Sequence, residues 1–201
     1  MSTRGAWGFY RKGTDRITYN HSDSYPTWLG SNIKEFIGKH SIEELNRICD
    51  LIIMVDQHST PTKAQIRECE VYHDDGVSTG QKTEWYSLIM NSQGDPEAYA
   101  TDLRYMIDSR SFMQDSLFCE WAYIINLDSN ELEIYEGFCK ERQSNRYSMT
   151  DEQIKAMREE DTRYNNNSYY EVRLVKQIPF ADVPKFDMEL FEEDQNESKA
   201  A

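Results

Sequence analysis

The spacing of apolar residues along the chain alternates between a period of two, typical of strands, and a period of 3.6, typical of helices. Near the start, residues 5–11 and 16–20 are rich in aromatic and β-branched side chains, which favour strands. The four residues between these runs include Gly13. A short glycine-containing connection between two such runs predicts a β-hairpin.

A second hairpin is predicted over residues 120–137. Residues 120–126 are almost entirely apolar, and after a short turn Leu132 and Ile134 alternate with charged residues. A nearly continuous apolar run is typical of a strand that is covered on both faces, so we expect this hairpin at the centre of the sheet. Residues 169–178 predict one further strand.

Helical spacing dominates the chain between the two hairpins and returns once after the second. The predicted helices span residues 31–40, 41–54, 60–72, 83–92, 96–107 and 150–160. The second of them begins with the capping box Ser41–Ile42–Glu43–Glu44, in which Ser41 and Glu44 each accept the other's backbone amide. In the third helix, Thr60 is expected as the N-cap and Pro61 as the first helical residue.

These elements predict an α+β fold. The fold would contain an antiparallel sheet of about five strands, two hairpins plus a C-terminal strand, with helices packed against it. We expect residues 1–184 to form a single domain. Residues 185–201 are acidic and are expected to form a mobile tail.

The composition changes this picture by excluding several classes of protein. A chain of 201 residues can bury a core without a metal or a disulfide. No apolar run approaches the roughly 18 residues that a membrane span needs, and the start lacks the pattern of a secretory signal, so we expect a cytoplasmic location. With 22 basic and 36 acidic residues, the net charge of −14 opposes direct binding to nucleic acid and to membranes.

Neither a cofactor nor a metal is predicted. The four cysteines are widely spaced, without a C-x-x-C pair, and are expected to be small buried hydrophobes: Cys49, Cys69, Cys119 and Cys139. The run His73–Asp74–Asp75 has metal-binding side chains but no second cluster, which indicates a solvated loop. The sequence also lacks the common phosphate-loop, dinucleotide-binding, serine-hydrolase and zinc-protease motifs.

The open end of the first hairpin is the strongest candidate site. Because a tight turn joins its two strands, residues that precede the first strand lie beside residues that follow the second. The side chains gathered there are expected to bind a ligand: Thr3, Arg4, Asn20, His21, Asp23 and Tyr25. Such a set suits an anion or a planar polar molecule. In the alternative interpretation, Asp23 and Ser24 cap a turn and Arg4 pairs with Asp23.

The same segment resembles an uncharacterised family of phage and bacterial proteins. The resemblance rests on the N-terminal M-S-T-R-G of residues 1–5 and on Y-x-x-x-D-S-Y-P-x-x-x-G from Tyr19 to Gly30, and covers about the first 40 residues. Together with the absent catalytic motifs, it favours a non-enzymatic, phage-encoded accessory protein of the host cytoplasm. Such a protein would bind a small polar or anionic ligand, or a host protein.

The segment is also similar, more distantly, to N-terminal nucleophile hydrolases of the bile-salt and penicillin amidase type. Those begin M-C-T and carry R-N-x-D at the end of the second strand. Here Ser2 stands at the position of the nucleophile and Asn20 and Asp23 at the polar pair, whereas Tyr19 replaces the arginine. This resemblance implies an amidohydrolase in which removal of Met1 frees an α-amine that serves as the base.

The acidic balance supports a third function. A strongly acidic protein can imitate the charge pattern of nucleic acid toward a basic groove. On this hypothesis the protein inhibits a host nucleic-acid-binding enzyme by occupying its groove.

Overall fold

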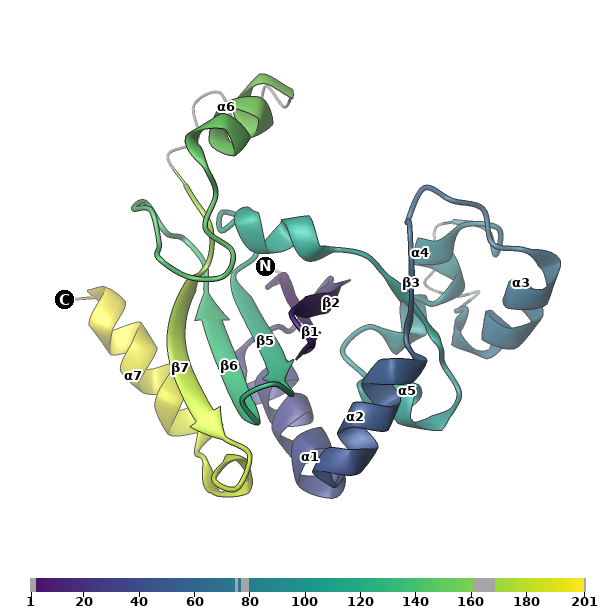
Figure 1. Cartoon of the computed structure of the whole chain (residues 1–201), viewed down its shortest axis with the longest axis horizontal. Coiled ribbons are helices and arrows are strands. Elements are labelled where there is room, and N and C mark those ends of the chain that lie inside the picture. Colours follow the sequence, from purple (N-terminus) through teal and green to yellow (C-terminus); the bar gives the residue numbers. More distant parts are fainter. Residues whose placement is uncertain (1–2, 75, 77–79, 161–168, 201) are drawn as a thin grey trace.

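The computed structural model describes residues 3–74, 76, 80–160 and 169–200. Five strands form one sheet in the order β2–β1–β5–β6–β7 (Figure 1). Their bounds are β1 Gly5–Arg11, β2 Thr14–Asn20, β5 Trp121–Asn126, β6 Glu131–Glu136 and β7 Arg173–Pro179. The predicted α+β class, both hairpins and the C-terminal strand are confirmed, and β5 of the second hairpin is the central strand.

One pair of neighbours departs from the predicted antiparallel sheet. β1 and β5 run parallel, with Gly5 opposite Trp121 and Tyr10 opposite Asn126, whereas the other three pairs are antiparallel. The chain leaves β2 at the end of the sheet where β1 begins, and it re-enters the sheet at that same end to start β5. The second hairpin therefore points in the same direction as the first strand.

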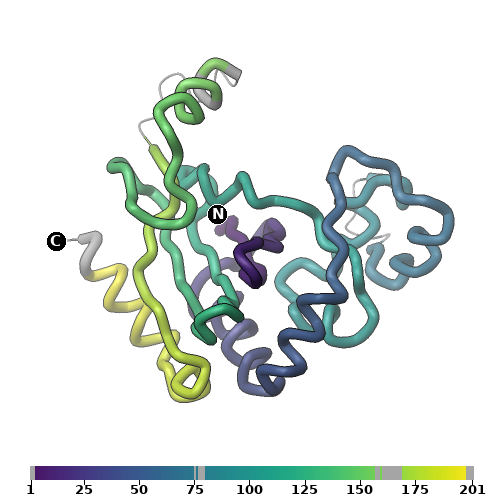
Figure 2. The backbone as a smooth tube through the Cα atoms, in the orientation of Figure 1, coloured from purple at the N-terminus to yellow at the C-terminus, as the bar shows by residue number. Residues whose placement is uncertain are grey.

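The remaining elements cover the sheet and form a side lobe that shares its core with the sheet; Figure 2 shows this lobe in blue and teal. A small parallel sheet pairs β3 Ile53–Val55 with β4 Tyr105–Ile107. The helices are η1 Pro26–Gly30, α1 Ser31–Lys39, α2 Ile42–Leu51, α3 Lys63–Cys69, η2 Glu70–Tyr72, α4 Trp85–Leu88, η3 Met90–Ser92, α5 Glu97–Thr101, η4 Arg110–Gln114, α6 Asp151–Glu160, η5 Val183–Lys185 and α7 Met188–Ala200. Within the described ranges, no helix has the length and apolar character to cross a membrane.

Two helices predicted from the sequence were too long, because each runs into a strand. The helix expected over 41–54 ends at Leu51, ahead of β3, and the one expected over 96–107 ends at Thr101, ahead of β4. The short apolar runs after these helices fit either period, and pairing between β3 and β4 decides in favour of strands.

The capping chemistry sets the other helix boundaries. The capping box of Ser41 and Glu44 is confirmed, as is the helix predicted from residue 150. The third helix begins later than predicted, at Lys63, because the hydroxyl of Thr62 rather than Thr60 accepts the amide of Gln65. The helix expected over 83–92 is divided into α4 and η3.

The acidic segment from residue 185 onward, for which the sequence suggested a mobile tail, contains the helix α7. Met188 and Phe191 on α7 are buried, and the Phe191 ring packs edge-on against Trp121 with the centroids 6.1 Å apart. The backbone amide of Thr27 donates to the Glu192 carboxylate at 3.0 Å. The apolar residues among the carboxylates therefore hold this helix against the fold.

The two faces of the sheet bury different kinds of core. Trp7, Phe9 and Tyr123 point to the face covered by α1, α2 and α7, where the larger apolar cluster lies. The alternate positions, including Ala6 and Ile124, point to a smaller cluster on the opposite face, beneath η4 and the segment after β6. This second face also carries the polar groups described below.

The hairpin packing can be tested with a pair of glycines. A Cβ on Gly8 would lie 2.0 Å from the backbone oxygen of Arg16 on the paired strand, whereas a Cβ on Gly38 in α1 would meet only Pro184 at 3.7 Å. We expect Gly8→Ala to lower the free energy of unfolding by about 2–3 kcal/mol. Gly38→Ala should raise it by about 0.5 kcal/mol because alanine favours helix. Urea unfolding of both variants measures these free energies. Equal changes in the two variants would contradict the close approach of the strands at Gly8.

Candidate functional site

The residues predicted at the open end of the first hairpin are divided between a cavity and its surroundings. Asn20, His21 and Asp23 line an open cavity of about 400 Å³, here called the hairpin-end cavity. Its remaining lining residues are Ser22, Trp28, Leu29, Asn32, Met90, Asn91, Gln93 and Gly94. Thr3, Arg4 and Tyr25 are not among them.

The three predicted residues outside the cavity have structural contacts. Thr3 is buried, and its carbonyl accepts the backbone amide of Ser24. The guanidinium of Arg4 lies over the Phe118 ring, 5.3 Å from the ring centroid, with the Arg4 backbone hydrogen-bonded to Glu120. The carbonyl of Tyr25 accepts two amides of η1.

A buried turn positions the first wall of the hairpin-end cavity. The amide nitrogen of Asn20 donates to the Ser22 carbonyl at 2.5 Å and to the Ser24 hydroxyl at 2.8 Å. The Tyr123 hydroxyl, on the central strand, donates to the Ser24 carbonyl at 3.0 Å. Asp23 has a positive φ of 55°, and its side chain is exposed. The turn therefore fixes the backbone and leaves the Asp23 carboxylate at the surface.

The opposite wall comes from residues that the sequence patterns did not single out. The Gln93 side-chain oxygen accepts the His21 backbone amide at 3.0 Å, and the Asn32 amide donates to the Gly94 carbonyl at 3.1 Å. Trp28 stands at the rim with 64% of its surface exposed. The sequence does show a segment with a tryptophan and, far along the chain, a second segment rich in amide side chains. Only folding brings these two segments together.

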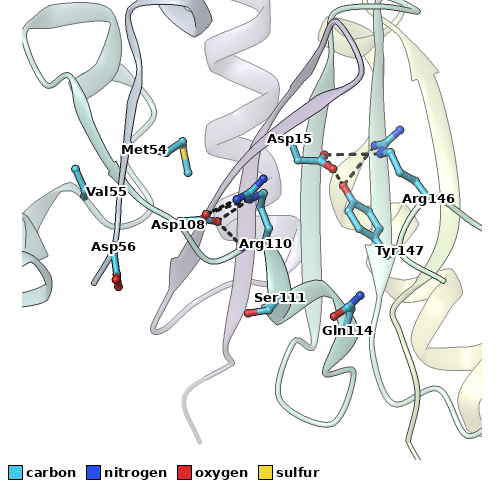
Figure 3. A pocket seen from close by; sticks show the side chains of 10 residues that line it. All are labelled: Asp15, Met54, Val55, Asp56, Asp108, Arg110, Ser111, Gln114, Arg146 and Tyr147. Atoms are coloured by element: carbon cyan, nitrogen blue, oxygen red, sulfur yellow. Dashed lines mark hydrogen bonds and ion pairs between the residues drawn. The ribbon is translucent and has the colours of Figure 1, made fainter. Parts of the chain in front are cut away.

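A larger cleft of about 650 Å³ lies between the small β3–β4 sheet and the second face of the main sheet (Figure 3). We call it the Asp–Arg cleft, and its lining residues are Asp15, Met54, Val55, Asp56, Asp108, Arg110, Ser111, Gln114, Arg146 and Tyr147. None of these residues was predicted as a site. Residues 54–56 and 106–108 repeat the pattern Met-Val-Asp and Met-Ile-Asp, but the predicted helices 41–54 and 96–107 ran into these two runs, so the repeat was not recognised.

One wall of the Asp–Arg cleft is a network around Arg146. Its guanidinium donates to the buried carboxylate of Glu133 and lies 3.8 Å from the centroid of the Tyr10 ring. Its Nε atom is 3.7 Å from Asp15 Oδ1, which also accepts the Tyr147 hydroxyl at 3.0 Å. Burial raises the pKa of Asp15, although Arg146 opposes that shift. The positive charge of Arg146 thus balances the negative charges of Glu133, which is buried, and Asp15, which is partly buried.

The floor of the cleft carries a second ion pair. Arg110 Nε donates to both carboxylate oxygens of Asp108, at 2.9 and 3.1 Å, and its terminal Nη2 donates at 2.6 Å. These hydrogen bonds from Arg110 lower the pKa of Asp108. Asp15 and Asp108 therefore face one cleft with pKa values shifted in opposite directions.

The other residues considered from the sequence contribute no metal centre in the part of the chain that the structure describes. Four buried thiols, at Cys49, Cys69, Cys119 and Cys139, belong to the packed interior. The His73 ring contacts the Ser87 carbonyl at 2.8 Å, and Asp75 lies outside the described residues. Ser2, the nucleophile of the hydrolase hypothesis, also lies outside them.

The Arg146 network makes a prediction about stability. Arg146→Ala leaves the Glu133 carboxylate buried without its cation, and we expect a loss of about 2–3 kcal/mol in the free energy of unfolding. This is less than for a fully buried pair because 23% of the Arg146 side chain is exposed. The matched control is Arg142→Ala, which breaks an exposed pair with Asp151 and should cost less than about 1 kcal/mol. If urea unfolding showed equal losses of stability for the two variants, the proposed role of Arg146 in balancing Glu133 would be refuted.

Comparisons with known proteins assign a function to neither cavity. No family model, curated protein or solved structure matches the chain. The candidate functions therefore differ only in how well they suit the chemistry of the lining side chains.

Proposed function

We propose that the protein is a non-enzymatic accessory protein that binds a small, planar, uncharged polar ligand in the hairpin-end cavity. The observation that carries this proposal is the exposed indole of Trp28 at the rim of a cavity lined with amide side chains. Indoles stack on flat rings, and amides donate and accept hydrogen bonds at the edges of such rings.

The exposure of Trp28 contrasts with the other tryptophans of the chain. Trp7, Trp85 and Trp121 are exposed by only 0%, 1% and 4%, whereas Trp28 is exposed by 64%. The side chain of Trp28 therefore loses much of the free energy that burial of an indole provides. A stacked ligand would recover that burial.

The lining of the cavity favours an uncharged ligand over an anion. None of the described residues that line it is a lysine or arginine, and the Asp23 carboxylate repels anions. Arg4, the cation that the sequence offered for anion binding, lies instead over Phe118. Asn32, Asn91 and Gln93 provide neutral donors and acceptors, which can recognise both edges of a polar ring.

Binding can be measured through Trp28 itself. Because the other three tryptophans are buried, acrylamide should quench mainly the fluorescence of Trp28. We expect a planar probe from a panel of cytosine, adenine and nicotinamide to protect Trp28 from quenching. Trp28→Ala should weaken binding of that probe, measured by calorimetry, at least about tenfold, as expected for loss of a stacking partner.

Two variants of residues outside the cavity serve as controls. Tyr25→Ala removes a partly exposed aromatic residue of the same segment, and Arg4→Ala removes the predicted anion-binding cation; both should leave binding unchanged. Failure of every planar probe to protect Trp28 would contradict the proposal. Binding that depends on Arg4 would favour an anion instead.

The hydrolase hypothesis has a separate test. In this chain the Asn20 amide, one member of the polar pair, is already held by Ser22 and Ser24, which supports a structural role for it. We expect Ser2→Ala to leave binding of the planar probe unchanged. We also expect no amide hydrolysis by the unmodified protein. Intact mass spectrometry that found Met1 removed, together with turnover abolished by Ser2→Ala, would instead establish the hydrolase.

A further inference from the structure

We infer that the Asp–Arg cleft is a second binding site, which takes a cationic group, an ammonium or guanidinium, carried on an aliphatic stem. Its ligand differs in charge from the one proposed for the hairpin-end cavity, and the two sites share no lining residue. This inference stands independently of the proposed function.

The charges around the cleft favour a cation. Three aspartates and two arginines line it, and one of these arginines, Arg146, is also paired with the buried Glu133, so the carboxylates outnumber the guanidinium groups. The chain as a whole carries a net charge of −14, which adds to the negative potential. An anion would be repelled by the carboxylates of the cleft and by the net charge of the chain, whereas a cation would neutralise part of the negative charge in the cleft.

Asp56 and Asp108 each follow the last residue of one of two paired parallel strands. Val55 pairs with Ile107 at the ends of β3 and β4, and the Asp108 amide donates to the Val55 carbonyl at 2.9 Å. The two aspartates therefore follow paired positions and face the same cleft (Figure 3). The cleft can therefore offer a cation one carboxylate from each of the two strands.

Asp56 has the carboxylate that is most available to a ligand. Its Oδ1 atom accepts the backbone amide of His58 at 2.9 Å, and within the described residues no cationic side chain forms an ion pair with it. Asp108 shares its charge with Arg110, and Asp15 shares its charge with Arg146. Excess negative charge is thus concentrated at Asp56.

The rest of the lining suits an aliphatic stem. Met54 on β3 presents an apolar side chain on the side of Asp108, and Ser111 and Gln114 offer neutral hydrogen-bonding groups elsewhere in the lining (Figure 3). The volume of about 650 Å³ lies within the roughly 300–1,000 Å³ typical of small-molecule sites. An alkyl chain can therefore lie against Met54 while its charged end reaches the carboxylates.

Proton linkage supports the same ligand charge. Burial raises the pKa of Asp15, with Glu133 adding to the shift and Arg146, Tyr147 and Arg110 opposing it. A bound cation favours the ionised form of Asp15, so its binding should strengthen as pH rises through the titration of this group. Binding of an anion would weaken over the same range.

The experiment uses agmatine, which carries an ammonium and a guanidinium group on an aliphatic chain, titrated into the full-length protein by calorimetry at low ionic strength. We expect saturable binding that Asp56→Asn weakens at least about tenfold, the effect of losing a charge-assisted contact. The matched control is Asp182→Asn, which removes one exposed carboxylate away from the cleft and should leave affinity unchanged. Equal weakening by both variants would overturn the site, because it would indicate only a response to net charge.

Arg110→Gln separates a cation site from an anion site. Arg110 is exposed and neutralises Asp108, so its removal frees a second carboxylate and should tighten agmatine binding. If the cleft instead binds anions, the same variant would abolish binding of a succinate probe and leave agmatine inert, which would refute the inference. Urea unfolding of each variant confirms that the fold is retained.

The cationic group could belong to a free amine or to a side chain of a protein partner, and a second probe distinguishes these two sources. Agmatine represents a free amine, and an acetylated, amidated tripeptide with a central arginine represents the side chain of a protein partner. Binding of either probe that depends on Asp56 supports the inference, and the tighter one identifies the source. Absence of binding by both would overturn it. Trp28→Ala, which alters only the hairpin-end cavity, should leave both affinities unchanged, so that failure of one site is distinguishable from failure of the other.

Discussion

The parallel pairing of β1 with β5 is the constraint on which both cavities depend. It requires a close approach at Gly5, where a Cβ would lie 2.4 Å from the Trp121 carbonyl and 2.5 Å from the Ser24 side chain. With β1 held against the central strand, β2 becomes the edge of the sheet. The last residue of β2, Asn20, reaches the hairpin-end cavity, and Asp15, near its start, reaches the Asp–Arg cleft.

The two cavities differ in chemistry because different elements complete them. The hairpin-end cavity is closed by η1 and the loop around Gln93, whose amide side chains and exposed Trp28 carry no positive charge. The Asp–Arg cleft is closed by the small β3–β4 sheet, which adds two aspartates where its parallel strands end. One strand can therefore serve two sites of unlike polarity, one at each end.

The candidate sites were only partly accessible from the sequence. The hairpin predicted that Asn20, His21 and Asp23 lie near the start of the chain, and all three line one cavity. Arg4 was expected there as well, but the neighbouring Phe118 ring attracts its guanidinium elsewhere. A hairpin register places backbones opposite one another, whereas the direction of a long side chain depends on groups that are distant in sequence.

The sequence alone determined the features that depend on neighbouring residues: the two hairpins, the capping box of Ser41, the helix that begins after residue 150, and the α+β class. What only the tertiary structure decided is how these pieces meet. The direction of β5 beside β1, the strands β3 and β4, and the docking of α7 through Phe191 all depend on partners far along the chain. A short apolar run fits a helix and a strand equally well, so its final form depends on which surface is available to bury it.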